Sequence, residues 1–232
     1  MRDSRERLIV ALDVSSAAAA KKIVAAVGDS ARYYKVGLQL YTAEGPQIVR
    51  DLVASGRQIF LDLKLHDIPN TVTAAVAEAC KLRVSMLTVH ASGGSKMLRA
   101  AVEAARLISP SPLILAVTVL TSLDQRDLES AGVRGSVVDQ VSRLAALSIS
   151  NGCHGVVASA QEAARLRVEL GDDFLIVTPG VRPAGRDHGD QARVVTPAEA
   201  IAAGATHIVV GRPITEAADP AAEAREILAQ IG

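Results

Sequence analysis

Short runs of β-branched and other apolar residues alternate with alanine-rich stretches along the 232 residues of the chain. This alternation is typical of βα units, in which each strand joins a parallel sheet and each helix packs against it. Eight such units of regular size predict a closed (β/α)8 barrel. The expected strands lie at 8–14, 33–37, 58–65, 84–91, 113–120, 155–159, 174–180 and 206–212, and the expected helices near 17–26, 46–54, 71–82, 95–107, 136–150, 160–170, 197–203 and 220–230.

An open, doubly wound sheet is the main alternative to a closed barrel. It is less well supported, because no GxGxxG motif follows the first expected strand and the regular unit length favours closure. No linker interrupts the pattern, and 232 residues suit one barrel better than two small domains. We therefore expect residues 1–232 to form a single α/β domain, a TIM barrel with its active site at the C-terminal ends of the strands.

Charge and cysteine content narrow the classes of partner and compartment. The 25 Lys and Arg residues balance the 25 Asp and Glu residues, which argues against binding to nucleic acid or to an anionic membrane. Cys80 and Cys153 lack the spacing of a disulfide framework, a zinc site or a redox pair. The N-terminal apolar run is too short for a signal peptide, and no segment has about 20 uncharged apolar residues. We expect a cytoplasmic protein with a small-molecule partner.

Polar residues collect at the expected C-terminal ends of the strands, which is where barrel enzymes carry their reactive groups. Seven of the eight ends carry a polar or charged side chain, and the remaining end carries a glycine in a turn-forming segment. The sequence therefore predicts one polar rim. Its members are Asp13, Lys35, Asp62 with Lys64, His90, Thr121, Ser159, Gly180 and Arg212.

The stretch 61-LDLKLHDIPNT-71 places charges at the end of an otherwise apolar strand. Asp62 and Lys64 are two residues apart, so their side chains are expected on one face, toward the barrel interior. A lone ion pair that plugs the barrel is the structural alternative, but burying ions without strong compensation is costly. Asp67 lies past the strand, where a turn or a helix-capping role is an equally ordinary explanation. Lys35 is a further cation in an apolar strand, and its alternative is a surface lysine with a buried stem.

The loops after the seventh and eighth strands are candidates for a phosphate site, because this fold often binds phosphate there. Gly180 and Gly211 allow close backbone approach, and the guanidinium of Arg212 suits a dianion. Residues 182–191 are rich in glycine, charge and turn formers, so we expect a loop that is mobile when empty and closes over phosphate. The alternatives are a strand-end surface arginine and a plain surface loop.

Five segments together resemble the orotidine 5'-phosphate decarboxylase family, in the correct order and over nearly the whole chain. A bare DxKxxD motif is shared across a wider superfamily, whereas the longer DxKxHDIPNT in company with the other segments is far more specific. The segments are ALDV at 11–14, YKVG at 34–37, DLKLHDIPNT at 62–71, TPGVRP at 178–183 and GRPIT at 211–215.

The resemblance implies an enzyme that converts orotidine 5'-phosphate to uridine 5'-phosphate (UMP) and CO2 in de novo pyrimidine biosynthesis, without cofactor or metal. It also implies a homodimer. Lys35, Asp62, Lys64 and Asp67 would form an alternating charge array around the reacting carbon, with Asp67 supplied by the other subunit. Such an array would explain why the chain buries charges at this strand end.

The same resemblance implies the remaining substrate contacts. Arg212 and Gln191 would bind phosphate beside Gly211, with Arg182 on the same loop. The nucleoside would be held by Asp13 at the ribose, by Thr121 at the pyrimidine edge, and by Thr71 of the partner subunit at the ribose.

Two further residues and two other functions stay open. His90 has no second histidine or carboxylate at metal-ligand spacing, so we expect a hydrogen-bonding residue at the rim, and the role of Ser159 is undetermined. One alternative function is a magnesium-dependent decarboxylase of sugar phosphates, of the 3-keto-gulonate 6-phosphate type. The other is a noncatalytic nucleotide-monophosphate binder, in which the lysine and aspartate array should be broken.

Overall fold

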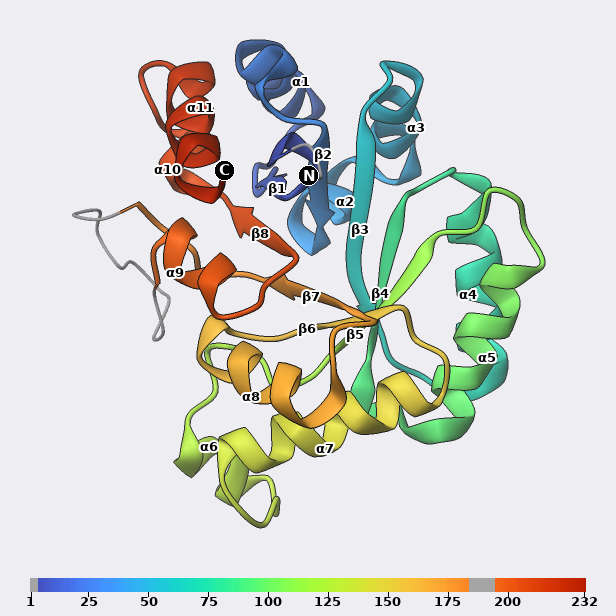
Figure 1. The fold of residues 1–232 in the computed structure, drawn as a ribbon. Coiled ribbons are helices and arrows are strands. Elements are labelled where there is room, and N and C mark those ends of the chain that lie inside the picture. Colours follow the sequence, from blue (N-terminus) through green and yellow to red (C-terminus); the bar gives the residue numbers. More distant parts are fainter. Residues whose placement is uncertain (1–3, 184–194) are drawn as a thin grey trace.

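The computed structural model describes residues 4–183 and 195–232. Within these residues, eight strands pair in chain order and close into a barrel, because β1 pairs in parallel with both β2 and β8 (Figure 1). The predicted closed barrel is therefore confirmed, and the doubly wound alternative is wrong. The strands are β1 (Leu8–Ala11), β2 (Tyr33–Gly37), β3 (Gln58–Leu65), β4 (Met86–His90), β5 (Leu113–Val117), β6 (Gly155–Val157), β7 (Leu175–Thr178) and β8 (His207–Val210).

Helices surround the barrel, and each predicted helix is present. Helices α1 and α11, from opposite ends of the chain, lie side by side (Figure 1). Several starts follow from local capping: Ser16 accepts a hydrogen bond from the amide of Ala19, and Pro46, Pro69 and Pro220 open their helices. The predicted helices are α1 (Ala17–Val27), α3 (Pro46–Ala54), α4 (Pro69–Lys81), α5 (Gly94–Arg106), α7 (Val137–Ser150), α8 (Ala160–Leu170), α9 (Pro197–Ala202) and α11 (Pro220–Ile231).

Short elements were missing from the prediction. The helices α2 (Leu38–Glu44), α6 (Gln125–Ser130) and α10 (Arg212–Thr215) are short, and short helices carry little periodic signal. The start of α6 had a readable signal, because Asp124 and Asp127 form a capping box. Three 3-10 turns complete the described elements: η1 (Ser4–Glu6), η2 (Gly28–Ser30) and η3 (Ala91–Gly93).

Several strands also end earlier than predicted. Asp13, Thr121, Ser159, Gly180 and Arg212 lie past the last paired residue of their strands. The chain leaves the ladder there and turns toward the following helix. The polar rim is therefore made largely of loop residues that rigid strands hold in place.

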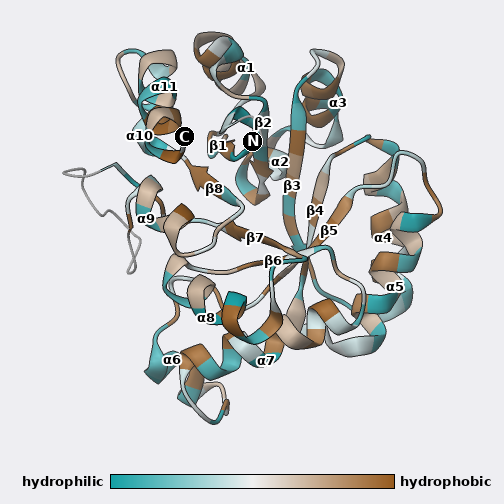
Figure 2. Cartoon of the chain, viewed as in Figure 1, coloured by the Kyte–Doolittle hydropathy of each residue, from teal (hydrophilic) through white to brown (hydrophobic). Residues whose placement is uncertain are grey.

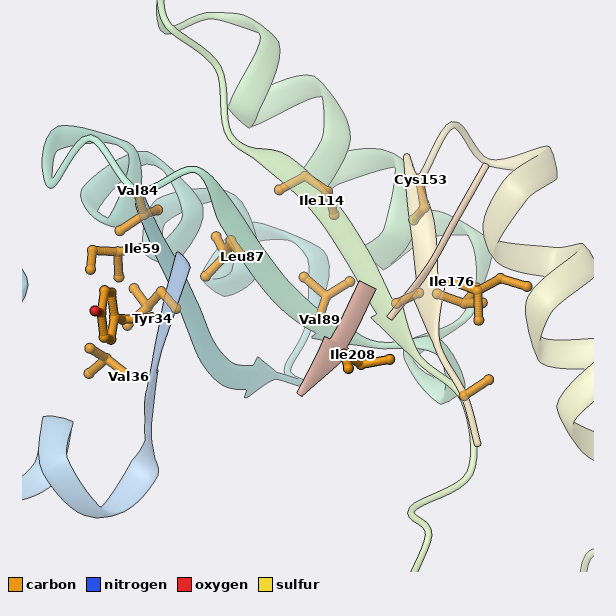
Figure 3. Close-up of a cluster of buried hydrophobic side chains, with 14 of the residues drawn as sticks. Tyr34, Val36, Ile59, Val84, Leu87, Val89, Ile114, Cys153, Ile176 and Ile208 are labelled. Atoms are coloured by element: carbon orange, nitrogen blue, oxygen red, sulfur yellow. The ribbon is translucent and has the colours of Figure 1, made fainter. Parts of the chain in front are cut away.

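Alternation along the strands produces two apolar layers. Outward-facing residues, such as Tyr34, Ile59 and Leu87, belong to the large cluster between barrel and helices (Figure 3). Strands are coloured mostly hydrophobic, while the helices carry both apolar and polar residues, as expected for helices with one face covered (Figure 2). The inward-facing residues form a smaller second cluster that fills the barrel: Ile9, Ala11, Phe60, Met86, Leu115, Val177 and Val209.

The barrel interior changes character toward the C-terminal ends of the strands. In β3, Phe60 packs in the inner cluster and Asp62 comes two residues later. In β4, Met86 packs there and Thr88 comes two residues later. Because side chains two apart share a face, the layer above the apolar filling is polar. A functional site at this end of the barrel rests on a packed apolar floor.

Candidate active site

A cavity of about 500 Å³ opens at the C-terminal ends of the strands. Its floor is apolar and includes Phe60 and Val209 of the inner cluster. Its walls come from the ends of β1, β2 and β3 on one side and from the loops after β5, β7 and β8 on the other. Its polar and charged lining residues include Asp13, Lys35, Asp62, Lys64, Thr121, Arg182, Arg212, Thr215 and Glu216.

Four charged side chains alternate in sign along one wall of the cavity. Lys35 Nζ lies 2.7 Å from Asp13 Oδ1 and 3.9 Å from Asp62 Oδ2. Lys64 Nζ lies 2.8 Å from the same Asp62 oxygen. The Asp62 and Lys35 side chains are only 11% and 13% exposed, so each depends on an opposite charge for its stability. We call Asp13, Lys35, Asp62 and Lys64 the charge array.

The array agrees with the sequence-based prediction in three of its four members. Lys35, Asp62 and Lys64 were expected together and lie together. Asp13 was expected at the ribose, and its partnership with Lys35 was not foreseen. The parallel register sets this contact, because Ala11 of β1 pairs with Lys35 of β2 and Asp13 follows two residues later.

Gly37 leaves the space that the contact between Lys35 and Asp13 needs. A β-carbon on Gly37 would lie 2.9 Å from Lys35 Nζ and 3.4 Å from Asp13 Oδ1. The backbone of Gly37 has φ −100°, so the requirement here is room for the neighbouring side chains and not an unusual backbone conformation.

The strand that carries Asp62 and Lys64 is irregular between them. Leu61 pairs with Leu87, but the next pairing joins Leu65 to Val89. Lys64 has φ 52°, a left-handed conformation that is uncommon for a residue other than glycine. The two charged side chains were expected to share a face through plain alternation. They do meet at the cavity, but through a bulge that redirects Lys64.

Thr88 was missed by the sequence-based analysis. Its side chain is fully buried, and its hydroxyl donates to Asp62 Oδ1 at 3.0 Å and accepts from the Lys64 amide at 2.9 Å. The available signal was a threonine on the inward-facing parity of β4, two residues after Met86. An inward hydroxyl in a packed barrel needs a polar partner, and Asp62 is that partner.

The predicted phosphate end lies on the side of the cavity opposite to β3. Gly180, Arg182, Gly211 and Arg212 line it together, with Arg182 largely buried. Gly180 has φ 75°, a conformation that favours glycine. The amide of Arg182 donates to the carbonyl of Val195 at 2.9 Å, which fixes the backbone here. Gln191 and most of the predicted closing loop fall in 184–194, outside the described residues.

Asp67 and Thr71 do not line the cavity of their own chain. Both are exposed: Asp67 precedes α4 and Thr71 lies in its first turn. Asp67 Oδ1 accepts a hydrogen bond from the Ile68 amide at 2.6 Å. Ile68 beside them is an exposed apolar side chain, with 66% of its surface accessible. A single chain therefore brings together the charge array but not the other two predicted residues of this motif.

His90 and Ser159 have local partners of their own. His90 Nδ1 lies 2.8 Å from the Ser92 hydroxyl, and its ring stacks on that of His66 with centroids 5.3 Å apart. Burial lowers the pKa of His90, and the nearby His66 and Lys64 lower it further, so neutral imidazole is favoured.

The amide and hydroxyl of Ser159 both donate to the Glu162 carboxylate, in a capping box that starts α8. Thr121 lines the cavity, as predicted.

The described residues lack two features that other functions would need. Within 4–183 and 195–232, no three His, Cys, Asp or Glu side chains group in a way that could hold a metal ion. In the same part of the chain, each helix is too short or too polar to cross a membrane.

Fold and site together define a (β/α)8-barrel enzyme whose cavity holds paired lysines and aspartates on one side and arginines on the opposite side. A family model described as "Orotidine 5'-phosphate decarboxylase / HUMPS family" matches residues 6–227. The chain therefore belongs to the orotidine 5'-phosphate decarboxylase family.

Individual relatives agree with this assignment. An orotidine 5'-phosphate decarboxylase of Moorella thermoacetica is 51% identical over 98% of this chain and 93% of its own length. The one of Afipia carboxidovorans is 52% identical over 98% and 95%. A crystal structure of orotidine 5'-phosphate decarboxylase from Lactobacillus acidophilus matches with a TM-score of 0.89 and 38% identity, covering 98% of this chain and 99% of that one. The expected family and its carboxy-lyase activity are confirmed.

The lowered pKa of His90 predicts a dependence of stability on pH. Between the folded and the unfolded pKa, the unfolded chain binds more protons, so the free energy of unfolding falls as pH drops below about 6.5. In the His90→Asn variant this contribution is absent. Urea unfolding from about pH 7.5 to about pH 5.5 should therefore show a smaller loss of stability in the variant than in the wild type. If the wild type and the variant lose the same free energy of unfolding over this pH range, the lowered pKa of His90 is contradicted.

Proposed function

We propose that the cavity binds orotidine 5'-phosphate and converts it to UMP and CO2, in de novo pyrimidine biosynthesis and without a cofactor. The observation that carries this proposal is the charge array, which holds two lysines and two aspartates in contact at one wall of a cavity with an apolar floor. Residues 1–232 would act as one catalytic domain, in the cytoplasm.

The reaction needs such an array because of where its charge develops. Loss of CO2 breaks the bond to C6 of the pyrimidine and leaves the electron pair on C6, where the ring offers no ordinary conjugated sink. A site without a cofactor must stabilise this pair with preoriented cations, and a cavity that excludes bulk water makes them most effective.

Lys64 is the group that would stabilise C6 and then protonate it. Its ammonium lies in the cavity wall with 30% of the side chain exposed, so it is both oriented and accessible to a ligand. The proton passes from Nζ to C6, and the neutral amine regains a proton from solvent. Atoms and charge balance: the carboxylate leaves as CO2, and a proton takes its place.

Asp62 and Lys35 would set the electrostatics around Lys64. The Asp62 carboxylate lies 2.8 Å from Lys64 Nζ and fixes its direction. A substrate carboxylate beside Asp62 would experience repulsion that is relieved when CO2 leaves. Lys35, between Asp13 and Asp62, offsets the charge of both carboxylates and makes the burial of Asp62 tolerable.

The rest of the substrate would span the cavity from the array to the arginines. The phosphate would lie against Arg212, Gly211 and Arg182, where a guanidinium fork suits a dianion. The pyrimidine would rest on the apolar floor with its edge at Thr121. Asp13, whose side chain is 56% exposed, would accept a ribose hydroxyl while it holds Lys35. Gln191 stays a predicted phosphate contact.

A homodimer would complete each site with Asp67 and Thr71 of the partner subunit. Three features support this. The two side chains are exposed and do not line the cavity of their own chain, they come within six residues of the end of the strand that carries Asp62 and Lys64, and Ile68 between them exposes apolar surface. In the partner's site, Asp67 would bring one more carboxylate beside Lys64, and Thr71 would reach the ribose.

The direct test is decarboxylation of orotidine 5'-phosphate by the purified protein, followed by ultraviolet absorbance with and without EDTA. We expect turnover that EDTA leaves unchanged, because the lysines supply the positive charge. Turnover abolished by EDTA would favour the magnesium-dependent alternative. Binding of UMP without turnover would favour the noncatalytic alternative. Either result would overturn the proposal.

Shared sites predict recovery of activity in mixed dimers. Chains with Lys64→Ala and chains with Asp67→Ala should each be nearly inactive alone. When the two chains are co-expressed with different tags, about half of the dimers are mixed. Each mixed dimer has one intact site of two, so the whole pool should regain about a quarter of wild-type activity. The measurement is the specific activity of doubly purified mixed dimers and of the whole pool.

A matched control uses two variants of the same chain segment. Asp62 and Lys64 lie in one site of one chain, so a mixture of Asp62→Ala and Lys64→Ala chains leaves every site defective. This mixture should stay inactive. Recovery in the control, or no recovery in the first mixture, would contradict the placement of Asp67 across the interface.

A further inference from the structure

The hydroxyl of Thr88 bonds both Asp62 and Lys64 of the charge array from outside the cavity lining. Thr88 lies on β4 with no exposed surface and is absent from the cavity lining. One oxygen makes both contacts: it donates its proton to Asp62 Oδ1 at 3.0 Å and accepts the Lys64 amide at 2.9 Å. A hydroxyl can serve as donor and acceptor at once, which a methyl group cannot.

The contact with Lys64 replaces a missing rung of the β3 and β4 ladder. Between the pairings of Leu61 with Leu87 and Leu65 with Val89, three residues of β3 oppose Thr88 alone. The amide of Lys64 donates to the Thr88 side chain. Since a partly buried amide needs an acceptor, the hydroxyl supports the left-handed backbone of Lys64, with φ 52°.

Because of the contact with Thr88, the two carboxylate oxygens of Asp62 have different partners. Oδ1 receives the Thr88 hydroxyl, while Oδ2 receives Lys64 at 2.8 Å and faces Lys35 at 3.9 Å. With Oδ1 held, the carboxylate plane cannot rotate without losing a bond. The direction of Oδ2, and through it the position of Lys64 Nζ, therefore depends on Thr88.

We propose that Thr88 is a positioning residue for the decarboxylation, acting through Asp62 and Lys64 without touching the substrate. It fixes the Lys64 backbone through the amide and the Lys64 ammonium through Asp62, so both ends of the lysine are aligned by one side chain. The inference rests on the proposed function, since it assigns Thr88 a part in that same reaction.

The test compares Thr88→Val, which keeps the shape and removes the hydroxyl, with Thr88→Ser, which keeps the hydroxyl. For orotidine 5'-phosphate, Thr88→Val should lower kcat about ten- to a hundredfold, because misplaced charge acts on the transition state. Its Kd for UMP, from calorimetry, should stay within about threefold of wild type, because the phosphate end is untouched. Thr88→Ser should keep kcat within about threefold.

Thr178→Val is the matched control. Thr178 ends β7 with no exposed surface, and within the described residues its hydroxyl has no hydrogen-bond partner. The same chemical change there should leave kcat within about twofold of wild type. A general effect of Thr to Val changes in the buried barrel would lower kcat in both variants, and that would overturn the proposal.

Further results would also overturn the positioning role of Thr88. The proposal fails if folded Thr88→Val keeps kcat within about twofold of wild type, or if Thr88→Ser is as impaired as Thr88→Val. If Thr88→Val does not fold by circular dichroism, Thr88→Ala takes its place under the same criteria, and loss of folding in both would assign the hydroxyl to stability instead. A wild-type protein without turnover would overturn the proposed function and this inference with it, whereas an active wild type with an unimpaired Thr88→Val variant would overturn this inference alone, so the two failures are distinguishable.

Discussion

The contact of the Asp62 carboxylate with two lysines is the interaction on which the rest of the site depends. An ionised group that is 11% exposed is unstable unless opposite charges and hydrogen bonds replace water. Lys64, Lys35 and the Thr88 hydroxyl make that replacement. The same neighbours fix Asp62 in one direction. The contacts that stabilise the buried Asp62 carboxylate therefore also orient the lysine ammonium groups for the decarboxylation.

The barrel supplies this arrangement because closure brings distant segments to one rim. Asp13, Lys35 and Asp62 come from three consecutive βα units. Parallel register pairs Lys35 with Ala11 and with Phe60, and the two aspartates each follow two residues after those partners. The inner cluster beneath them keeps water out from below. Arg182 and Arg212, more than a hundred residues later in the chain, close the opposite side of the cavity. Fold and chemistry are separable here, since the packed apolar floor holds the barrel and the polar layer above it performs the reaction.

Much of this could be predicted from the sequence, because strand periodicity identifies which residues face inward. Alternation predicted eight strands and placed Asp62 on the inner face. The left-handed backbone of Lys64 could not be foreseen, since lysine has no local preference for it and the bulge arises from pairing with β4. Thr88 and the contact of Asp13 with Lys35 were missed for the same reason, because both depend on register between strands. Strand ends were placed too late where polar rim residues leave the ladder.

The most direct test of the central claim is the turnover of a folded Lys64→Ala variant. If the Lys64 ammonium stabilises the developing charge at C6 and protonates it, kcat for orotidine 5'-phosphate should fall by at least about a thousandfold. Binding of UMP should persist, because Arg182, Gly211 and Arg212 lie at the far end of the cavity. A kcat within about tenfold of wild type, with folding and binding intact, would contradict the account.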